Sequence, residues 1–475
     1  MLINSRSQAL QLTVLVFATV AFTSAVAGPV LAQSLPMLNA PPATRSFGRL
    51  TEWAAGRWHL AERISTVGGQ ASSRKTLSDD AVRPVQGQQQ TPLLSSISGY
   101  MDFHVNNVEH RDATVDFHRF VLLFTHSFSD RVRFVSELEL EHAFVEGLEE
   151  AGELELEQAY IDFLVTRKLN LRAGMLLVPV GIINERHEPP VYHGVERPFV
   201  DTFIVPSTWF EGGAGVHGEL GRGVRYRAYV MAPLDASGFS ADEGIRGGRQ
   251  KGAEATVRNV ATTGRVEYVG IAGLWAGASF WRGKTGFSFP RVETQVSLAE
   301  VDARYRIGEL ETRAQYVHAW LTGMGELNRT VQRTVGVSPN VASQIRGFYL
   351  EASYFVLSQP APREAAAFLR YENFDTQYRM PVGFDPMGQF DRDAWVVGLS
   401  YYPDPDVVLK VDYSLVRNQS TVIAEPNSFN IGLGWWFEDG VDGFSEASVC
   451  VWPGRVVCCR RASPCAERPS GGDGG

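Results

Sequence analysis

The chain has 475 residues, of which 11% are aromatic and 46 are glycine, and its mean hydropathy is -0.11. Its formal net charge of -9 argues against a nucleic-acid partner, because such partners require a basic surface. All four cysteines lie between positions 450 and 465, which excludes a disulfide framework for the body of the chain. A composition that is polar on average yet rich in strand-forming residues is typical of strands with one apolar and one polar face.

Residues 1–32 have the parts of a secretory signal peptide. Arg6 is followed by the apolar run LTVLVFATVAF, and small residues then lead to Ala32. The alternative, a membrane-spanning helix, is disfavoured because Gly28 and Pro29 interrupt the segment and no basic stop-transfer segment follows. We therefore expect cleavage after Ala32 and export. No later window holds about 18 apolar residues without a charge, which argues against a helical membrane protein.

Residues 33–94 form a different region. Apolar residues from Phe47 to Ile64 recur near helical spacing, and a linker rich in Gly, Ser and Gln follows through QGQQQTP. We expect a periplasmic lead-in that is partly helical, and a disordered segment is an equal alternative.

From Ile97 the hydrophobic period becomes two. In RVRFVSELELEH, apolar residues alternate with charged ones such as Glu137 and Glu139, and AEVDARYRI, GVRYRAYV and NIGLGWWF repeat the pattern. Such runs give about sixteen strands up to Phe437, roughly 21 residues for each strand with its connection, which suits tilted membrane-crossing strands. The phase slips near Glu157, which predicts a β-bulge.

The connections alternate in length. Short ones occur at 129–130, 221–223, 271–272 and 403–406, and long ones at 144–152, 235–259 and 323–343. An outer-membrane barrel has short turns at one end and long loops at the other, whereas a soluble sandwich has no reason to do so. The sequence therefore predicts an all-β fold, a transmembrane antiparallel β-barrel over residues 95–437, since a sheet in lipid must close.

The third long loop, residues 181–211, contains four prolines and charges of both signs. A segment this stiff and this charged is a candidate to fold into the barrel and narrow it, and an external lid is the alternative. The predicted pore-constriction residues are Glu185, Arg186, Glu188, Glu196, Arg197 and Asp201.

The polar face of the strands predicts the wall of the pore. Mixed rings of charge would orient hydrated solutes, and clustered arginines would attract anions; an ordinary solvated wall is the alternative for any one residue. The predicted lining residues are Arg225, Arg227, Arg304, Arg313, Arg370 and Lys410, among Glu137, Glu139, Glu155, Glu157, Glu300 and Glu372.

Enzymatic motifs are absent in their required contexts. The run GAGVHG at 213–218 lies among short-turn strands with no following helix, and His187 and His193 are separated by two prolines, unlike the spacing of H-E-x-x-H. We therefore expect no catalytic residue, no metal and no cofactor. A hydrolase embedded in the barrel remains an alternative, because its site can be assembled from distant strands.

Several stretches resemble the phosphate-selective porin family. AFLRYENFDT, VVGLSYYPDPDVVLKVDYSLV and NIGLGWWF resemble its last strands, and LRAGMLLVPVG with ERPFVDTFIVPSTWFEGGAGVHGEL resembles its third-loop region, so that the likeness covers about residues 97 to 437. The resemblance implies a sixteen-stranded barrel, often trimeric, that passes anions. Members selective for phosphate line the pore with an arginine ladder and a lysine cluster, whereas acidic residues here are at least as numerous as arginines and lysine is scarce.

The barrel pattern ends at Phe437, the aromatic terminal residue that the assembly machinery of such barrels reads. A further segment, 438–475, contains all four cysteines and no strand alternation, and we expect it to lie outside the barrel and to be dispensable. The partners expected are outer-membrane lipid, the barrel-assembly machinery, small hydrophilic solutes or anions, and further copies of the chain in a homotrimer.

These observations favour a bacterial outer-membrane porin, a passive diffusion channel for small hydrophilic solutes or anions such as phosphate. Two alternatives stay open: a barrel-embedded hydrolase, and a structural or adhesive barrel plugged by its third loop.

Overall fold

The computed structural model describes residues 95–142, 152–286, 288, 292–357, 363–438, 450–452 and 455–457. The signal peptide and the lead-in predicted over 1–32 and 33–94 lie outside these residues.

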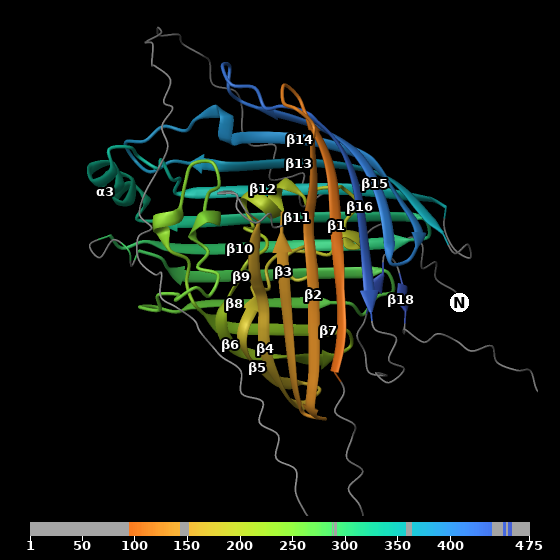
Figure 1. Cartoon of the computed structure of the whole chain (residues 1–475). Coiled ribbons are helices and arrows are strands. Elements are labelled where there is room, and N and C mark those ends of the chain that lie inside the picture. Colours follow the sequence, from red (N-terminus) through yellow and green to blue (C-terminus); the bar gives the residue numbers. More distant parts are fainter. Residues whose placement is uncertain are drawn as a thin grey trace, which may run out of the picture. The chain divides into compact units, whose positions relative to one another are not determined.

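Sixteen antiparallel strands form one closed sheet, in which β1 pairs with β16 and every other pair is consecutive in sequence (Figure 1). The strands of the first half are β1 (Ser95–Val108), β2 (Thr114–Ser129), β3 (Val132–Glu141), β4 (Glu153–Thr166), β5 (Leu169–Leu177), β6 (Phe210–Gly221), β7 (Val224–Met231) and β8 (Ala261–Tyr268). Those of the second half are β9 (Leu274–Lys284), β10 (Gln295–Ile307), β11 (Leu310–Thr322), β12 (Gln344–Leu357), β13 (Glu364–Arg379), β14 (Asp391–Asp404), β15 (Val407–Asn418) and β16 (Ser428–Glu438). The predicted strand number and closure are confirmed.

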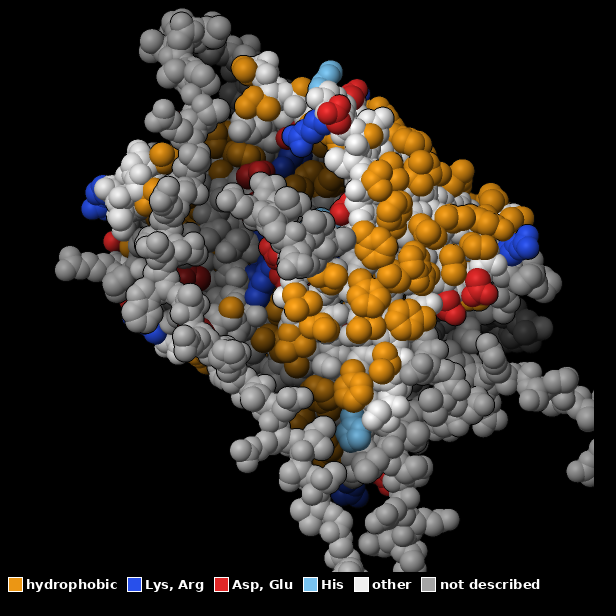
Figure 2. Space-filling view, viewed as in Figure 1, with side chains coloured by type: hydrophobic (Ala, Val, Ile, Leu, Met, Phe, Trp, Pro, Cys, Tyr) orange, Lys and Arg blue, Asp and Glu red, His pale blue; other side chains and the backbone are white. Residues whose placement is uncertain are grey.

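The two faces of the sheet have the polarity that a barrel in lipid requires. In β3, Glu137 and Glu139 are each 2% exposed, whereas Leu138 between them is 41% exposed. Figure 2 shows hydrophobic side chains covering the outer surface around β1, β16 and β15. A soluble β-sandwich would bury its apolar face, so this inverted pattern places the apolar side chains against lipid and the polar ones inside.

Connections of two kinds alternate around the barrel. Two-residue turns join strands at 130–131, 167–168, 222–223, 308–309 and 405–406. Arg222 and Gly223 both have positive φ, 52° and 79°, which matches the twist that a two-residue turn needs between antiparallel strands. The longest described connections, at the opposite end of the strands, are 178–209, 232–260 and 323–343.

The predicted β-bulge is present. Between β3 and β4, Gln158 lies opposite Glu137 and Leu156 lies opposite Leu138, which leaves Glu157 without a partner in the register. Glu157 is 2% exposed, so the bulge turns an additional carboxylate toward the interior.

Short helices lie in the long connections. They are η1 (Pro189–Val191), α2 (Phe199–Phe203), η2 (Ala236–Gly238), η3 (Arg246–Gly248), α3 (Met324–Val335) and η4 (Gly388–Phe390). Within the described part of the chain, none of these helices has the length and hydropathy needed to cross a membrane.

The apolar core lies inside the barrel, where the long connections pack against the wall. Trp209 of the 178–209 connection contacts Trp281 of β9, with ring centroids 5.3 Å apart. Val178, Ile183, Leu234, Ile245 and Leu327 from three connections are all fully buried in the same cluster. This packing fixes the connections that shape the interior.

Two further strands follow the barrel. β17 (Cys450–Trp452) and β18 (Arg455–Val457) pair only with each other and form a separate sheet. The barrel sheet itself ends at Glu438, one residue after the predicted end.

Candidate functional site

The connection between β5 and β6, residues 178–209, lies inside the barrel and is called the inner loop. The Val195 amide donates to Asp412 Oδ2 at 2.6 Å, and the Val200 amide donates to Glu372 Oε2 at 3.0 Å. The Ile182 amide donates to Gln315 Oε1 at 2.8 Å. Carboxylates and an amide of β11, β13 and β15 therefore hold the loop backbone, which places the loop within the lumen and not over the rim.

Prolines and aromatic packing restrict the conformation of the inner loop. Pro189 and Pro190 begin η1 and restrict the backbone there. In α2, Phe199 and Phe203 stack on Phe374 of β13, with ring centroids 5.2 Å and 5.4 Å apart. Aromatic packing and the backbone hydrogen bonds thus hold the loop from both sides.

The six predicted constriction residues fall into two groups. Glu196 and Arg197 line an internal cavity, described below. Three of the other four contact the wall: Glu185 pairs with Arg227 at 3.1 Å, Arg186 pairs with Glu267 at 3.3 Å, and Asp201 accepts from Gln315 Nε2 at 2.9 Å. The fourth, Glu188, is half-buried and immediately precedes η1. Burial raises the pKa of Asp201 to about 7, because an ionised carboxylate there lacks water.

The predicted wall residues form ion pairs within strands, between strands and with the long connections. Arg313 contacts Glu311 at 2.7 Å, Arg370 contacts Glu372 at 2.7 Å, and Glu139 contacts Arg119 at 3.5 Å. Their other members behave alike: Arg225 pairs with Glu219, Arg227 with Glu185, Arg304 with Glu311, Glu300 with Arg265 and Glu155 with Lys251, and Glu137 is near His187. Each predicted arginine of the wall therefore has a carboxylate partner.

Lys410 differs from the arginines of the wall. Its Nζ donates to the carbonyl of Gly194 at 2.8 Å and lies 3.8 Å from the ring centroid of Tyr192. It therefore fastens the inner loop to β15 as a hydrogen-bond donor.

A cavity of about 380 Å³ lies between the inner loop, the 232–260 connection and strands β2 to β4. It is at the long-loop end of the barrel, because its wall comes from the start of β2, the end of β3 and the start of β4. Its lining is mostly polar and charged: His118, Arg119, Glu141, His142, Glu155, Glu157, Tyr192, Glu196, Arg197, Phe199, Thr202, Phe203, Ser207, Thr208, Arg246, Arg249 and Lys251.

Every carboxylate that lines this cavity has a basic partner. Glu141 lies 3.7 Å from Arg119, and Glu196 lies 3.0 Å from His104. Glu157 lies 3.1 Å from His187, and Glu155 contacts Lys251. Each acidic residue of the lining thus has a basic neighbour, and Arg119, His104 and His187 each face a second carboxylate as well.

Three arginines of the lining have only neutral partners. Arg197 donates to the Thr208 hydroxyl at 2.9 Å, and Arg246 and Arg249 donate to backbone carbonyls at 202 and 206 to 208. Among the residues that the structure describes, none of the three has a carboxylate at ion-pair distance. Burial, together with the neighbouring Arg249, lowers the pKa of Arg246 to about 10, which still leaves it charged at neutral pH.

Sequence reasoning missed Arg246 and Arg249. The segment IRGGRQK of the 232–260 connection is the signal that could have indicated them, since it concentrates three basic residues in a loop rich in glycine. Arg265, Glu267, Glu311 and Glu351 were also missed, although the alternation of their strands places them on the inner face.

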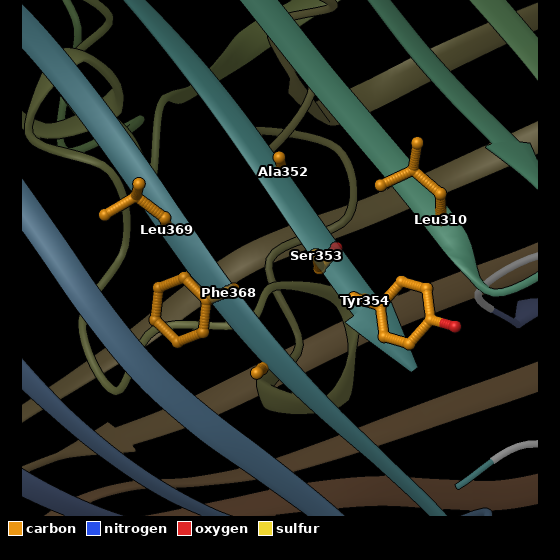
Figure 3. A pocket seen from close by; sticks show the side chains of 7 residues that line it. Leu310, Ala352, Ser353, Tyr354, Phe368 and Leu369 are labelled. Atoms are coloured by element: carbon orange, nitrogen blue, oxygen red, sulfur yellow. The ribbon is translucent and has the colours of Figure 1, made fainter. Parts of the chain in front are cut away.

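A second depression lies on the outer surface of the barrel, over β11, β12 and β13 (Figure 3). Small side chains at Ala352 and Ala367 leave it between Leu310, Tyr354 and Leu369. It is apolar and on the lipid-facing side, so we assign it to contact with acyl chains and not to solute chemistry.

Similar proteins occur among curated sequences and among solved structures. A curated relative from Aquifex aeolicus (strain VF5), described as an uncharacterized protein, is 33% identical over 353 residues, which cover 72% of this chain and 80% of the relative. An anion-selective porin from Comamonas acidovorans is 13% identical, with a TM-score of 0.48, over 73% of this chain and 100% of that one. The outer membrane channel DcaP of Acinetobacter baumannii is also 13% identical, with a TM-score of 0.46, over 73% of this chain and 97% of that one.

The model of one protein family matches residues 97–433, nearly the whole barrel. That span, the closed sheet of sixteen strands, the lipid-facing apolar surface and the charged interior make the chain a channel protein of the bacterial outer membrane. It belongs to the phosphate-selective porin O and P family.

Proposed function

We propose that this outer-membrane channel lets small hydrophilic solutes diffuse passively and favours anions, such as phosphate, over cations. The observation that carries the proposal is the set of three arginines, Arg197, Arg246 and Arg249, that line the internal cavity without a carboxylate partner among the described residues. Uncompensated positive charge in a confined cavity raises the local concentration of anions and lowers that of cations.

The pairing of the wall arginines supports the same proposal. Arginines such as Arg313 and Arg370 are held by carboxylates, so that they add little net field along the pore. The preference for anions then rests on the arginine-rich cavity and not on an arginine ladder. The inner loop, stiffened and anchored as described, sets the width of the passage, with Glu196 and Arg197 at the cavity surface.

The hydrolase alternative finds weaker support. Among the described residues, the serine–histidine pair with a carboxylate at ion-pair distance is Ser353 and His193, whose Oγ and Nε2 are 3.0 Å apart. The nearest carboxylate, Glu311, lies 3.7 Å from the same Nε2 and not at Nδ1, where a triad acid would orient the ring. Both Ser353 and His193 are fully buried, which also keeps a substrate away. We therefore expect no ester or peptide hydrolysis by the purified protein.

Planar lipid bilayers test the proposal directly. With a tenfold KCl gradient across the membrane, the zero-current potential should have the sign set by chloride, and stepwise conductance should appear as single proteins insert. A potential with the sign set by potassium would contradict the preference for anions. Absence of conductance from folded protein would favour the plugged barrel.

Two partner assignments accompany this function. The family resemblance implies a homotrimer, to be checked by the mass of the detergent-solubilised protein. Phe437, near the end of β16 and opposite Gly99 of β1, is proposed as the residue that the assembly machinery reads. Replacement of Phe437 by Ala should lower the yield of folded barrel, whereas the same change at the lipid-facing Leu415 should not.

A further inference from the structure

Three metal-binding side chains meet where β3, the bulge of β4 and the inner loop come together. Glu137, Glu157 and His187 each offer an oxygen or nitrogen atom, and these atoms lie within 4.8 Å of one another. All three residues are 2% exposed. The bulge places Glu157 here, because it adds one residue to β4 opposite Glu137 and Leu138.

The orientation of His187 leaves a lone pair directed at carboxylates. Its Nδ1 lies 3.2 Å from the carbonyl oxygen of Asn184, which can only accept, so Nδ1 carries a hydrogen. In a neutral ring Nε2 then has the lone pair, and it lies 3.1 Å from Glu157 Oε2 and 3.6 Å from Glu137 Oε1. A lone pair facing two carboxylates requires a positive charge between them, either a proton or a metal ion.

Three buried atoms of this cluster make no hydrogen bond of standard geometry, although the first two face each other at 3.1 Å. They are His187 Nε2, Glu157 Oε2 and Glu139 Oε2. Glu139 lies on the same face of β3 as Glu137, and Arg119 is its basic neighbour at 3.5 Å. A divalent cation bound at Nε2 would give these buried carboxylate oxygens a positive partner between the two strands and the inner loop.

The spacing and surroundings also fit a metal. Zinc bonds of about 2.0–2.1 Å in a tetrahedron separate the ligand atoms by about 3.3 Å, close to the two separations seen at His187. The carbonyl of Asn184 orients the histidine, and Gln158 and Tyr100 donate to Glu137, as outer partners of metal ligands commonly do. Glu157 also lines the internal cavity, which gives an ion a path of entry.

We propose that Glu137, Glu157 and His187 bind a divalent cation of the zinc class, which fastens the inner loop to the barrel wall. Imidazole with carboxylates is the ligand set of such first-row cations. The ion would link one residue of the loop to two adjacent strands. The tether is independent of the ion preference of the channel, since it requires only that the barrel and loop fold as described.

Zinc binding to the full chain tests the proposal. The four cysteines are replaced by serine, because thiolates also bind zinc. The protein, folded in detergent and freed of metal with a chelator, is titrated with ZnCl₂ in a calorimeter. We expect one saturable tight site, and His187→Gln should weaken its affinity by at least about 100-fold, as loss of a ligand should exceed loss of an outer partner.

A matched control distinguishes this site from another candidate cluster. Asp116, His118 and His142 could hold an ion at the surface of the cavity, with His118 also adjacent to His104 and Glu196. The control variant His142→Gln should leave the tight site unchanged. The assignment would be overturned if His142→Gln lost tight binding or if His187→Gln kept it. A wild-type protein that takes up no zinc would also overturn it.

The zinc absorption-edge spectrum provides a test that needs no substitution at the site. The proposed set contains one imidazole, whereas the two alternative clusters each contain two histidines. A fit with one imidazole and the remaining ligands oxygen supports the proposal. A fit with two imidazoles would overturn it. Slower proteolysis within residues 178–209 on zinc addition, lost in His187→Gln, would show the tether itself.

Discussion

Replacing Arg246 and Arg249 together by glutamine should weaken the preference of the channel for anions. Both guanidinium groups donate to backbone carbonyls of the inner loop, and Arg249 Nε also donates to the carbonyl of Arg246. The amide of glutamine can still donate. Among the described residues, no carboxylate loses a partner at ion-pair distance. The substitution therefore removes two positive charges from the cavity while leaving the barrel wall unchanged.

The size of the effect follows from the cavity. A volume of about 380 Å³ equals a sphere of about 4.5 Å radius, so an ion at its centre is about 6 Å from a guanidinium group at the wall. In water one such interaction is about 0.7 kcal/mol, and screening with a Debye length of about 10 Å at 0.1 M salt reduces it to about 0.4 kcal/mol. Two charges then change anion occupancy about fourfold and cation occupancy about fourfold in the opposite direction. The permeability ratio should shift on the order of tenfold toward cations.

The assay is the zero-current potential of the variant in planar bilayers at about 0.1 M salt, where screening is moderate. A matched control, Arg131→Gln with Arg222→Gln, removes two exposed charges at the short-turn end and should change the ratio less than about twofold. Single-channel conductance shows whether the inner loop has moved. An unchanged ratio in Arg246→Gln/Arg249→Gln, or an equal shift in the control, would refute the role of the cavity.

Four other outcomes are expected. Deletion of residues 185–200 in a variant that still folds should raise single-channel conductance, and unchanged conductance would remove the constriction assignment. Burial raises the pKa of Asp201 to about 7, so the protonated side chain stabilises the packed loop at low pH, and this stability is lost as the pH rises from about 4 through 7. Current noise should therefore be greater at pH 8 than at pH 5. The variant Asp201→Asn should abolish that difference. Arg313→Gln removes one of two arginine partners from each of Glu311 and Glu351, which keep Arg304 and Arg370. The thermal melt should therefore show a loss of stability smaller than the roughly 3–5 kcal/mol expected for a buried charge left wholly unpaired. Truncation after Glu438 should leave a heat-modifiable, protease-resistant barrel, and loss of assembly would show that the tail belongs to the fold.

The barrel could be predicted because its physics is local. Lipid on one face and water on the other force alternation along every strand. The side-chain types of Glu137 and Leu138 therefore indicate the face on which each lies, whatever the neighbouring strand is. The bulge at Glu157 is visible for the same reason, as a break in phase. Loop lengths distinguish the two ends of the barrel, because two-residue turns lie at one end and the connections long enough to fold into the lumen lie at the other.

The site was harder to predict because it depends on contacts between distant segments. Asp201 is an acidic residue of the inner loop, yet it turns toward Gln315 on β11 and not into open solvent. Arg246 approaches the inner loop only because the 232–260 connection folds inward, which no local pattern indicates. Whether a wall arginine is neutralised depends on strand register, as when Arg370 meets Glu351 on β12.

Charge-dependent labelling inside the cavity tests the central claim, that anions pass beside the unpaired arginines. Thr202 lines the cavity within α2, and Thr202→Cys in a background without the four native cysteines provides one reactive thiol there. Negatively and positively charged thiosulfonate reagents of equal length are added while current through a single channel is recorded. The account predicts that the negative reagent reacts faster and that each reaction lowers the current in a step. Faster reaction of the positive reagent, or labelling that leaves the current unchanged, would contradict it.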